Sequence, residues 1–271
     1  FPTREGFNYV IAAVNYNNKY YFLDATDNHS APNILPTRAL NWTGRLIKEN
    51  GEVKELDLYP KELSRRNTLL NVSITEEGDV EGQYKCNYTK LEALNFRINN
   101  RGRNIEDTKD NIIKTYDFTE LDTYEQLNLN ELNKPVNENF SFIKEEAVDF
   151  VAGDMYINPL LFMRLEENPF KADSRNFPIN YSYPFSYRRM INIKIPEGYT
   201  IKSLPEPVRL GLADGMGSFT YNLQESNGTI SITSTFTMKY SKVPADYYNM
   251  LKEFYTQRVA KENEKVVLTK T

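Results

Sequence analysis

The distribution of hydrophobic and polar residues predicts a chain built mainly of β-strands. Residues 70–74 alternate apolar and polar side chains, as expected for a strand with one buried face. Residues 190–195, 219–223 and 230–238 alternate in the same way, and the turn residues 224–228 join the last two. Alternating strands joined by tight turns can bury one face only against another layer, so the pattern favours an antiparallel β-sandwich.

Three segments change from strand-like to helical spacing of their apolar residues. The first is expected to begin with a capping box formed by Thr89 and Glu92, and the second with Asn104 as its cap. Pro244 is typical of a first helical turn and is expected to open the third. The helices are expected near residues 90–99, 105–116 and 244–260, the first two as an insertion between strands.

The first sixty residues have the pattern of two hairpins. Residues 7–14 and 20–23 are predicted strands around an Asn-rich turn, and both faces of the first strand are mostly apolar, which predicts burial on both sides. A second hairpin is predicted around the turn at 49–51. Residues 118–185 are less regular, with strands expected near 124–129, 140–144 and 149–157.

The first hairpin resembles a known catalytic core. The segment Phe7-Asn8-Tyr9-Val10-Ile11-Ala12, a hairpin, and then Tyr21-Phe22-Leu23-Asp24-Ala25-Thr26-Asp27 are similar to the end of the transglutaminase-like core of the papain-type superfamily. The resemblance is closest to large bacterial envelope proteins in which this core lies between two β-rich domains. It implies that residues 1–60 are the last hairpins of such a core, and that residues 61–271 are a β-sandwich domain with inserted helices.

The resemblance also assigns positions to a Cys-His-Asp triad. In the family, the His polarises the Cys thiol and the Asp orients the His. The Asp position corresponds to Asp24, whereas the His position holds Tyr9. A phenol with an ordinary pKa near ~10 cannot replace imidazole as a base at neutral pH. The Cys position would lie before Phe1, so the triad is expected to be degenerate at Tyr9 and Asp24, with no catalytic residue in this chain.

The single cysteine and the single histidine do not complete the triad. Cys86 follows Asp24 in the chain, which is the wrong order, and alternates inward with Val80, Tyr84 and Tyr88, so it is expected to be a small buried side chain. His29 lies in a turn-like stretch, where a solvated surface residue is expected. For Asp24, the simplest interpretation from the residues alone is a carboxylate that closes the strand-end turn.

Composition narrows the classes of partner. The 271 residues carry a formal net charge of −4 with no basic run, so nucleic acid is not an expected partner. No apolar run reaches the roughly 20 residues that a membrane helix needs. Phosphate-loop, H-E-x-x-H and EF-hand spacings are missing, and the glycine-rich residues 211–217 precede a strand, so no cofactor or metal is expected. The 19 tyrosines suit either β-sheet packing or the binding of a glycan or a protein.

Two functional hypotheses follow. The first is a non-catalytic binding or scaffold module of a bacterial envelope protein, with a periplasmic or cell-envelope location implied by the resemblance and an unknown protein or glycan as partner. The alternative is the truncated C-terminal portion of an active cysteine protease or transglutaminase whose nucleophile lies upstream. The chain begins at Phe1 rather than Met, which indicates a processing site or the cut end of a longer protein. A cysteine at a helix start upstream would distinguish the two hypotheses.

Overall fold

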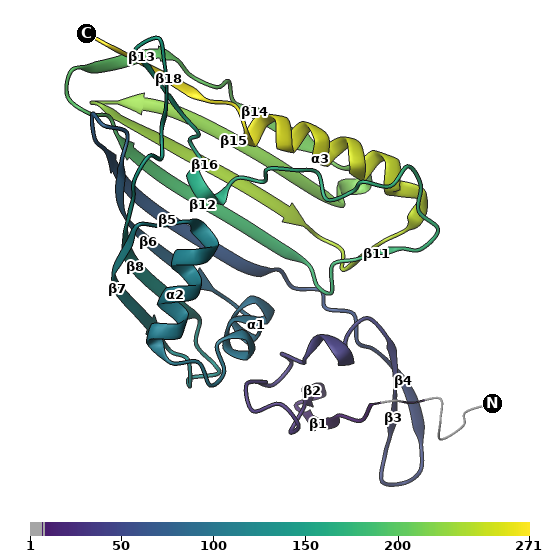
Figure 1. The fold of residues 1–271 in the computed structure, drawn as a ribbon. Helices are drawn as coiled ribbons and strands as arrows, with labels where there is room; N and C mark the ends of the chain where they lie inside the picture. Colours follow the sequence, from purple (N-terminus) through teal and green to yellow (C-terminus); the bar gives the residue numbers. More distant parts are fainter. Residues whose placement is uncertain (1–6, 8) are drawn as a thin grey trace.

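A computed structural model describes residue 7 and residues 9–271 (Figure 1). Its largest element is an eight-stranded sheet made of β5 (Ser64–Ile74), β6 (Val80–Tyr88), β7 (Glu120–Leu127), β8 (Val136–Lys144), β12 (Phe185–Lys194), β14 (Val208–Gly211), β15 (Gly217–Ser226) and β16 (Thr229–Met238). The strand order is β14-β15-β16-β12-β5-β6-β8-β7. All neighbours are antiparallel except β12 and β5, which run parallel at the centre. The predicted fold class, mainly β with antiparallel sheets and few helices, is confirmed.

Three helices pack on one face of this sheet, namely α1 (Leu91–Asn99), α2 (Ile105–Tyr116) and α3 (Tyr248–Glu262). Figure 1 shows α1 and α2 over the half that contains β5 to β8, and α3 over the half that contains β14 to β16. The core lies between, with Leu70, Ile191, Ile232 and Leu251 fully buried. The opposite face carries polar side chains that bond across strands, as in the 2.8 Å bond from the Asn192 amide to Asn71.

A second, four-stranded sheet extends this core. Its strands are β9 (Asp149–Val151), β10 (Asp154–Ile157), β13 (Tyr199–Ser203) and β18 (Val266–Lys270), in the order β13-β18-β10-β9. The single strand expected at 149–157 was wrong, because β9 and β10 form a tight hairpin. Ala152 and Gly153 have φ of 54° and 90°, and two consecutive left-handed residues reverse the chain.

The bounds of α1 and α2 agree with the predictions, whereas α3 begins at Tyr248 because Pro244 opens the 3-10 turn η5 before it, and one predicted cap is absent. Asn104 caps α2, because its side chain accepts a 2.7 Å bond from the Asp107 N–H. The capping box predicted at α1 was wrong. The Thr89 hydroxyl instead accepts the Arg65 N–H at 3.0 Å, and Glu92 turns inward to Arg66. The residue before α1, Lys90, makes no side-chain cap bond.

Two small hairpins form the N-terminal part of the described chain: β1 (Ala12–Tyr16) with β2 (Lys19–Leu23), and β3 (Thr43–Ile47) with β4 (Val53–Asp57). The burial predicted on both sides of the first strand was wrong. Tyr9, Ile11 and Phe22 pack toward the core, whereas Val10 is 84% exposed. Within the described residues only one face of this hairpin meets another layer.

Short elements complete the connections. Strands β11 (Ile179–Asn180) and β17 (Lys242–Val243) pair with each other beside the N-terminal hairpins. The remaining elements are single 3-10 turns, η2 (Thr37–Ala39), η3 (Leu161–Met163), η4 (Ala213–Gly215) and η5 (Ala245–Tyr247). The glycine-rich residues 211–217 form the hairpin loop between β14 and β15. The domain boundary near residue 60 stays a prediction.

Candidate functional site

The two positions that the sequence singled out, Tyr9 and Asp24, lie at the open end of the first hairpin. Strand β1 pairs with β2 through Ala12 and Leu23, and extending that register puts Tyr9 opposite Thr26. Tyr9 and Asp24 are therefore diagonal neighbours. The Tyr9 hydroxyl donates a hydrogen bond to Oδ2 of Asp24, and it lies 2.7 Å from the Thr26 hydroxyl. The two residues that the resemblance assigned to triad positions are thus in direct contact.

Three groups besides Tyr9 hold the Asp24 carboxylate. Its Oδ1 accepts the Thr26 N–H at 2.9 Å and the Thr26 hydroxyl at 2.7 Å. The Arg38 guanidinium lies 3.4 Å from Oδ2, and it stacks 5.0 Å from the centre of the Tyr9 ring. Burial acts to raise the pKa of Asp24, but the hydrogen bonds from Tyr9 and Thr26 and the charge of Arg38 outweigh it and lower that pKa.

Arg38 was not recognised from the sequence. It lies in η2, a single 3-10 turn with no periodic pattern, and its guanidinium also bonds the Thr26 hydroxyl at 3.0 Å. The hydrogen bond to Tyr9 is the main cause of a raised pKa of Arg38, against the effect of burial. The cluster of Tyr9, Asp24, Thr26 and Arg38 is thus a closed network of a carboxylate, two hydroxyls and a cation.

Cys86 is distant from this cluster in the fold. It lies in the second half of β6, is 2% exposed, and its thiol is 3.4 Å from the Thr68 hydroxyl. The predicted burial is confirmed. Burial raises the pKa of the thiol, against the opposing effect of hydrogen bonds from Thr68, Tyr84 and Tyr88. A raised pKa keeps the sulfur as a thiol at neutral pH, which is the unreactive form.

His29 lies in the turn that follows Asp24, as predicted. Its backbone N–H donates to the Asp27 side chain at 3.0 Å, which is the local bond of an Asx turn. The residue is half-buried rather than fully solvated, since it lines a small pocket with Lys90 and Arg97. The structure therefore brings Tyr9 and Asp24 together but brings neither Cys86 nor His29 into hydrogen bonding with them.

A second group of polar residues was missed by the sequence analysis. The register of the large sheet aligns one inward-facing row across six strands: Tyr221, Ser234, Arg189, Thr68, Cys86 and Glu138. Glu138 accepts the hydroxyls of Tyr88 at 2.8 Å and Tyr124 at 2.9 Å, and burial raises its pKa despite those bonds. A usable signal existed, because Arg189 and Glu138 occupy inward positions of strands whose other inward residues are apolar.

Carboxylates from the helices meet this row from above. Glu92 on α1 is 2.8 Å from Arg66 of β5 and accepts the hydroxyls of Tyr183 and Tyr187, each at 2.8 Å. Glu262 at the end of α3 lies 3.4 Å from Nη1 of Arg189 of β12. Buried charges need such partners, so the helix layer is tied to the sheet by ion pairs as well as by apolar contact.

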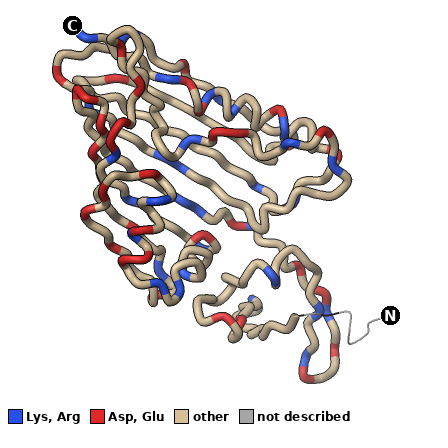
Figure 2. Tube along the Cα trace, viewed as in Figure 1, with Lys and Arg blue, Asp and Glu red and all other residues tan. Residues whose placement is uncertain are grey.

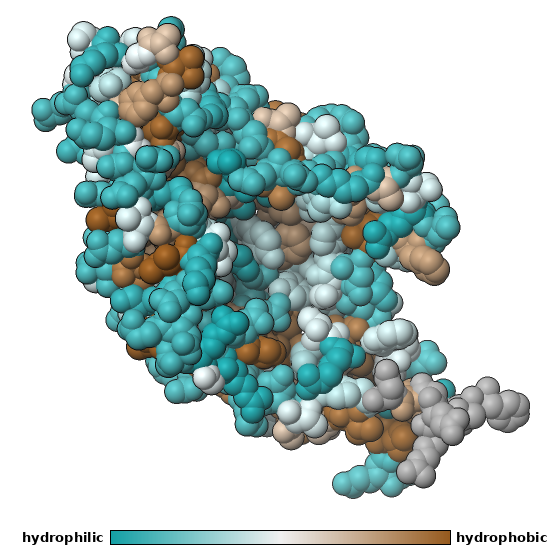
Figure 3. All heavy atoms as spheres, in the orientation of Figure 1, coloured by the Kyte–Doolittle hydropathy of each residue, from teal (hydrophilic) through white to brown (hydrophobic). Residues whose placement is uncertain are grey.

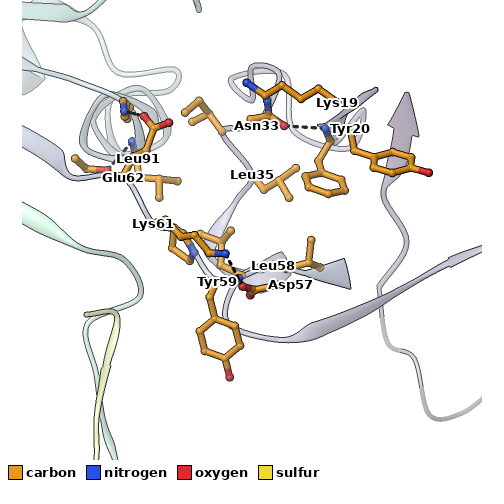
Figure 4. Close-up of a pocket in the computed structure, with 16 residues that line it drawn as sticks. Lys19, Tyr20, Asn33, Leu35, Asp57, Leu58, Tyr59, Lys61, Glu62 and Leu91 are labelled. Atoms are coloured by element: carbon orange, nitrogen blue, oxygen red, sulfur yellow. Dashed lines mark hydrogen bonds and ion pairs between the residues drawn. The ribbon is translucent and has the colours of Figure 1, made fainter. Parts of the chain in front are cut away.

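A cavity of about 390 Å³ lies between the N-terminal hairpins and the large sheet (Figure 4). It is lined by Tyr20, Leu35 and Leu58 on the hairpin side and by Leu91 on the α1 side. Figure 4 shows the Tyr59 ring pointing away from it, and the ion pair of Lys61 with Asp57, at 3.0 Å, at its edge. Its wall is mostly apolar, so the cavity could bind a group by apolar contact but is not arranged for acid–base catalysis.

Comparison with known proteins gives a partial family match. The family DUF3858, described as a domain of unknown function with a solved structure, matches residues 153–268, the part that contains β10 to β18. A solved structure described as a "putative protease" from Parabacteroides distasonis is similar with a TM-score of 0.42 and 9% identity. The match covers 95% of this chain and 35% of that one, so the chain spans about a third of its length. A likeness this distant carries no argument about activity.

No curated protein matches the chain. Within residue 7 and residues 9–271, no group of three or more His, Cys, Asp or Glu side chains could hold a metal ion. In the same part of the chain, none of the helices combines the length and the apolar character needed to cross a membrane.

Proposed function

We propose that this chain is a non-catalytic binding or scaffold module of a bacterial envelope protein, and that it carries the end of a degenerate transglutaminase-like core. The observation that carries the proposal is the set of partners that bind the Asp24 carboxylate. This carboxylate is occupied by Tyr9, Thr26 and Arg38. A catalytic Asp would instead accept the ring N–H of a histidine. The envelope location and the mapping onto a triad rest on the sequence resemblance.

The chemistry of the cluster supports the same proposal. The neutral Tyr9 hydroxyl, which donates to the carboxylate, is too weak a base to take a proton from a thiol, and the cation of Arg38 stabilises the charged form of Asp24. The alternative, an enzyme truncated at its N-terminal side, would require a base that the cluster does not contain. Cys86, buried in the opposite part of the fold, cannot serve as its nucleophile.

An exposed aromatic surface supports a binding role. Trp42, the single tryptophan, is 64% exposed beside β3, and Tyr59 is 41% exposed after β4. Lys242 of β17 lies 5.3 Å from the centres of both rings and donates to the Asn41 carbonyl at 3.0 Å. The two rings are thus fixed at the junction of the hairpins and the large sheet. Exposed, rigid Trp and Tyr side chains are characteristic of binding surfaces.

Cosedimentation with the envelope fraction of the host cell tests this role. We expect the chain to pellet with that fraction and not with cytoplasmic material. Trp42→Ala should weaken binding by about thirty-fold, since a central aromatic anchor contributes roughly 2 kcal/mol. Phe150→Ala is the matched control, because Phe150 is another exposed aromatic residue, at 46%, and it lies in β9 of the second sheet.

Protease digestion of the fraction beforehand separates the two partner classes, because binding to a protein is lost and binding to a glycan is kept. Equal pelleting with cytoplasmic material, or wild-type binding by Trp42→Ala, would reject the proposal.

A further inference from the structure

The helix-covered face of the large sheet has an opening at its centre. The helices α1 and α2 cover one half and α3 the other, and between them lies a cavity of about 210 Å³ over β5 and β12. Figure 3 shows this face hollowed at the centre. Arg66 and Thr68 of β5 and Tyr187 and Arg189 of β12 line the cavity from below. Figure 2 shows basic residues on these central strands.

The guanidinium of Arg189 has few hydrogen-bond partners for a charged group that is largely buried. The side chain of Arg189 is 19% exposed, and its Nη1 lies 3.4 Å from both oxygens of Glu262. In the part of the chain that the structure describes, Nη1 is the only nitrogen of this guanidinium that makes a hydrogen bond. An arginine fork has five N–H groups, so most of the donors of Arg189 remain for another acceptor.

Glu262 has little capacity left to neutralise Arg189. Its Oε1 accepts Nε of Arg258 at 2.7 Å, and its Oε2 accepts the Leu165 N–H at 2.6 Å. Two arginines therefore share one fully buried carboxylate. The other carboxylate above the cavity, Glu92, is taken by Arg66 and by two tyrosine hydroxyls. The charges around the cavity leave an excess positive charge at Arg189.

Burial lowers the pKa of Arg189, and the nearby charges of Arg258 and Arg66 add to this effect against Glu262. The direction agrees with the geometry, since a fully compensated arginine would be favoured in its charged form. Burying an incompletely paired charge costs stability unless a ligand supplies the missing partner.

Aromatic rings form the other wall of the cavity. Tyr116 at the end of α2 and Phe162 of η3 have ring centres 4.8 Å apart, and Tyr84 of β6 lies 6.4 Å from Phe162. Met163 completes this wall. The cavity therefore combines a cationic floor with an apolar side, a pairing suited to a small molecule that has a charged end and a flat body.

We propose that this cavity binds a small organic oxyanion, whose carboxylate, sulfate or phosphate group is held by Arg189 and Arg66 and whose body packs against Tyr116 and Phe162. Arginine matches such groups because its planar fork donates two parallel hydrogen bonds. The inference adds a ligand to the partner proposed above and does not depend on that partner. The cavity is separate from the surface around Trp42, so the two can fail independently.

Methyl NMR of the intact chain tests the inference, with Met163 as the reporter. Benzoate is the probe, and benzamide, nearly the same in shape but neutral, is its control. At constant ionic strength, we expect benzoate to shift the Met163 methyl signal saturably and benzamide at least about tenfold more weakly, because a charge-assisted bond exceeds a neutral one. Sulfate and phosphate, titrated in parallel, show which oxyanion is preferred.

Two variants locate the effect. Arg189→Gln should weaken benzoate binding at least about tenfold, because the charged partner is removed. Arg65→Gln should bind as the wild type does, since Arg65 is exposed on the opposite face of the neighbouring strand β5. No saturable shift in the wild-type protein, equal shifts from benzoate and benzamide, or unchanged binding by Arg189→Gln would overturn the inference. Envelope binding that depends on Trp42 would be unaffected by any of these results.

Discussion

Burial and hydrogen bonding act on the Asp24 carboxylate in opposite directions. Its side chain is fully buried, yet its pKa is lowered because Tyr9, Thr26 and Arg38 all favour the charged form. A carboxyl group with a lowered pKa in the folded state stabilises the fold at neutral pH. That stabilisation is lost as the pH falls below the ordinary value of 3.8 and through the folded-state pKa.

Replacing Tyr9 tests this residue-scale account. Tyr9→Phe should lower the free energy of unfolding by about 1 kcal/mol at pH 7, the net value of one hydrogen bond, or by somewhat more because Asp24 loses a partner while buried. The loss should shrink in acid, where Asp24 becomes protonated. Denaturant unfolding at several pH values measures it. Unchanged stability at pH 7 would make Asp24 only a turn residue.

Tyr9→His is the matched variant. Imidazole can donate a ring N–H to the carboxylate, so we expect near wild-type stability and no thiol-dependent activity. A gain of peptidase or transamidase activity in this variant would contradict the account.

At the scale of elements, α1 is fastened to the hairpin of β7 and β8 by one buried arginine. Arg97 is 4% exposed and donates to the carbonyls of Leu129, Asn128, Glu131 and Lys134 at 2.8–3.1 Å. The backbone carbonyls of the loop between the two strands therefore accept hydrogen bonds from a helix side chain rather than from a neighbouring strand. Burial lowers the pKa of Arg97, the cost of placing a charge there.

Arg97→Met should destabilise the protein by roughly 2–4 kcal/mol, because several buried carbonyls lose a charged donor at once. Hydrogen exchange should rise first in residues 128–135. Arg101→Met, at an exposed site after α1, is the control and should change stability by less than about 0.5 kcal/mol. Uniform exchange across the molecule would mean that Arg97 does not fasten this loop.

The same scale shows which elements the sequence could predict. Hairpins such as β3–β4 and β15–β16 were predictable, because the left-handed Gly51 and Gly228 mark their turns locally. The parallel pairing of β5 with β12 was not, because it joins distant segments and no local residue records it. The capping box predicted for α1 is absent because Glu92 instead forms an ion pair with Arg66, a residue distant in the sequence.

The candidate sites divide in the same way. The resemblance singled out Tyr9 and Asp24 as triad positions, whereas Arg38 lies in an irregular segment with no recognisable pattern. Arg189, Ile191 and Ile193 are alternate residues of β12 and so lie on the same face of the sheet. Strand alternation could therefore have predicted that Arg189 points inward. Its shared carboxylate, Glu262, comes from a helix whose docking the sequence does not specify.

At the scale of the whole molecule, the described chain separates three surfaces. The polar cluster at Asp24 and the aromatic pair at Trp42 belong to the N-terminal hairpins, and the arginine cavity opens on the helix-covered face of the large sheet (Figure 1). Cys86 lies below that face between Thr68 and Glu138 in the row of polar residues. Its thiol contacts Thr68, which lines the arginine cavity, but Cys86 is itself buried and lines none of these surfaces.

The labelling rate of Cys86 in the native protein tests the non-catalytic account most directly. A thiol reagent at neutral pH should modify Cys86 only as fast as the protein unfolds, and at once in denaturant. A Cys86→Ser, Ser73→Cys variant is the control, since Ser73 is exposed on neighbouring β5 and its replacement should react immediately. Native Cys86 that reacts as fast as this control, or activity abolished by Cys86→Ser alone, would contradict the account.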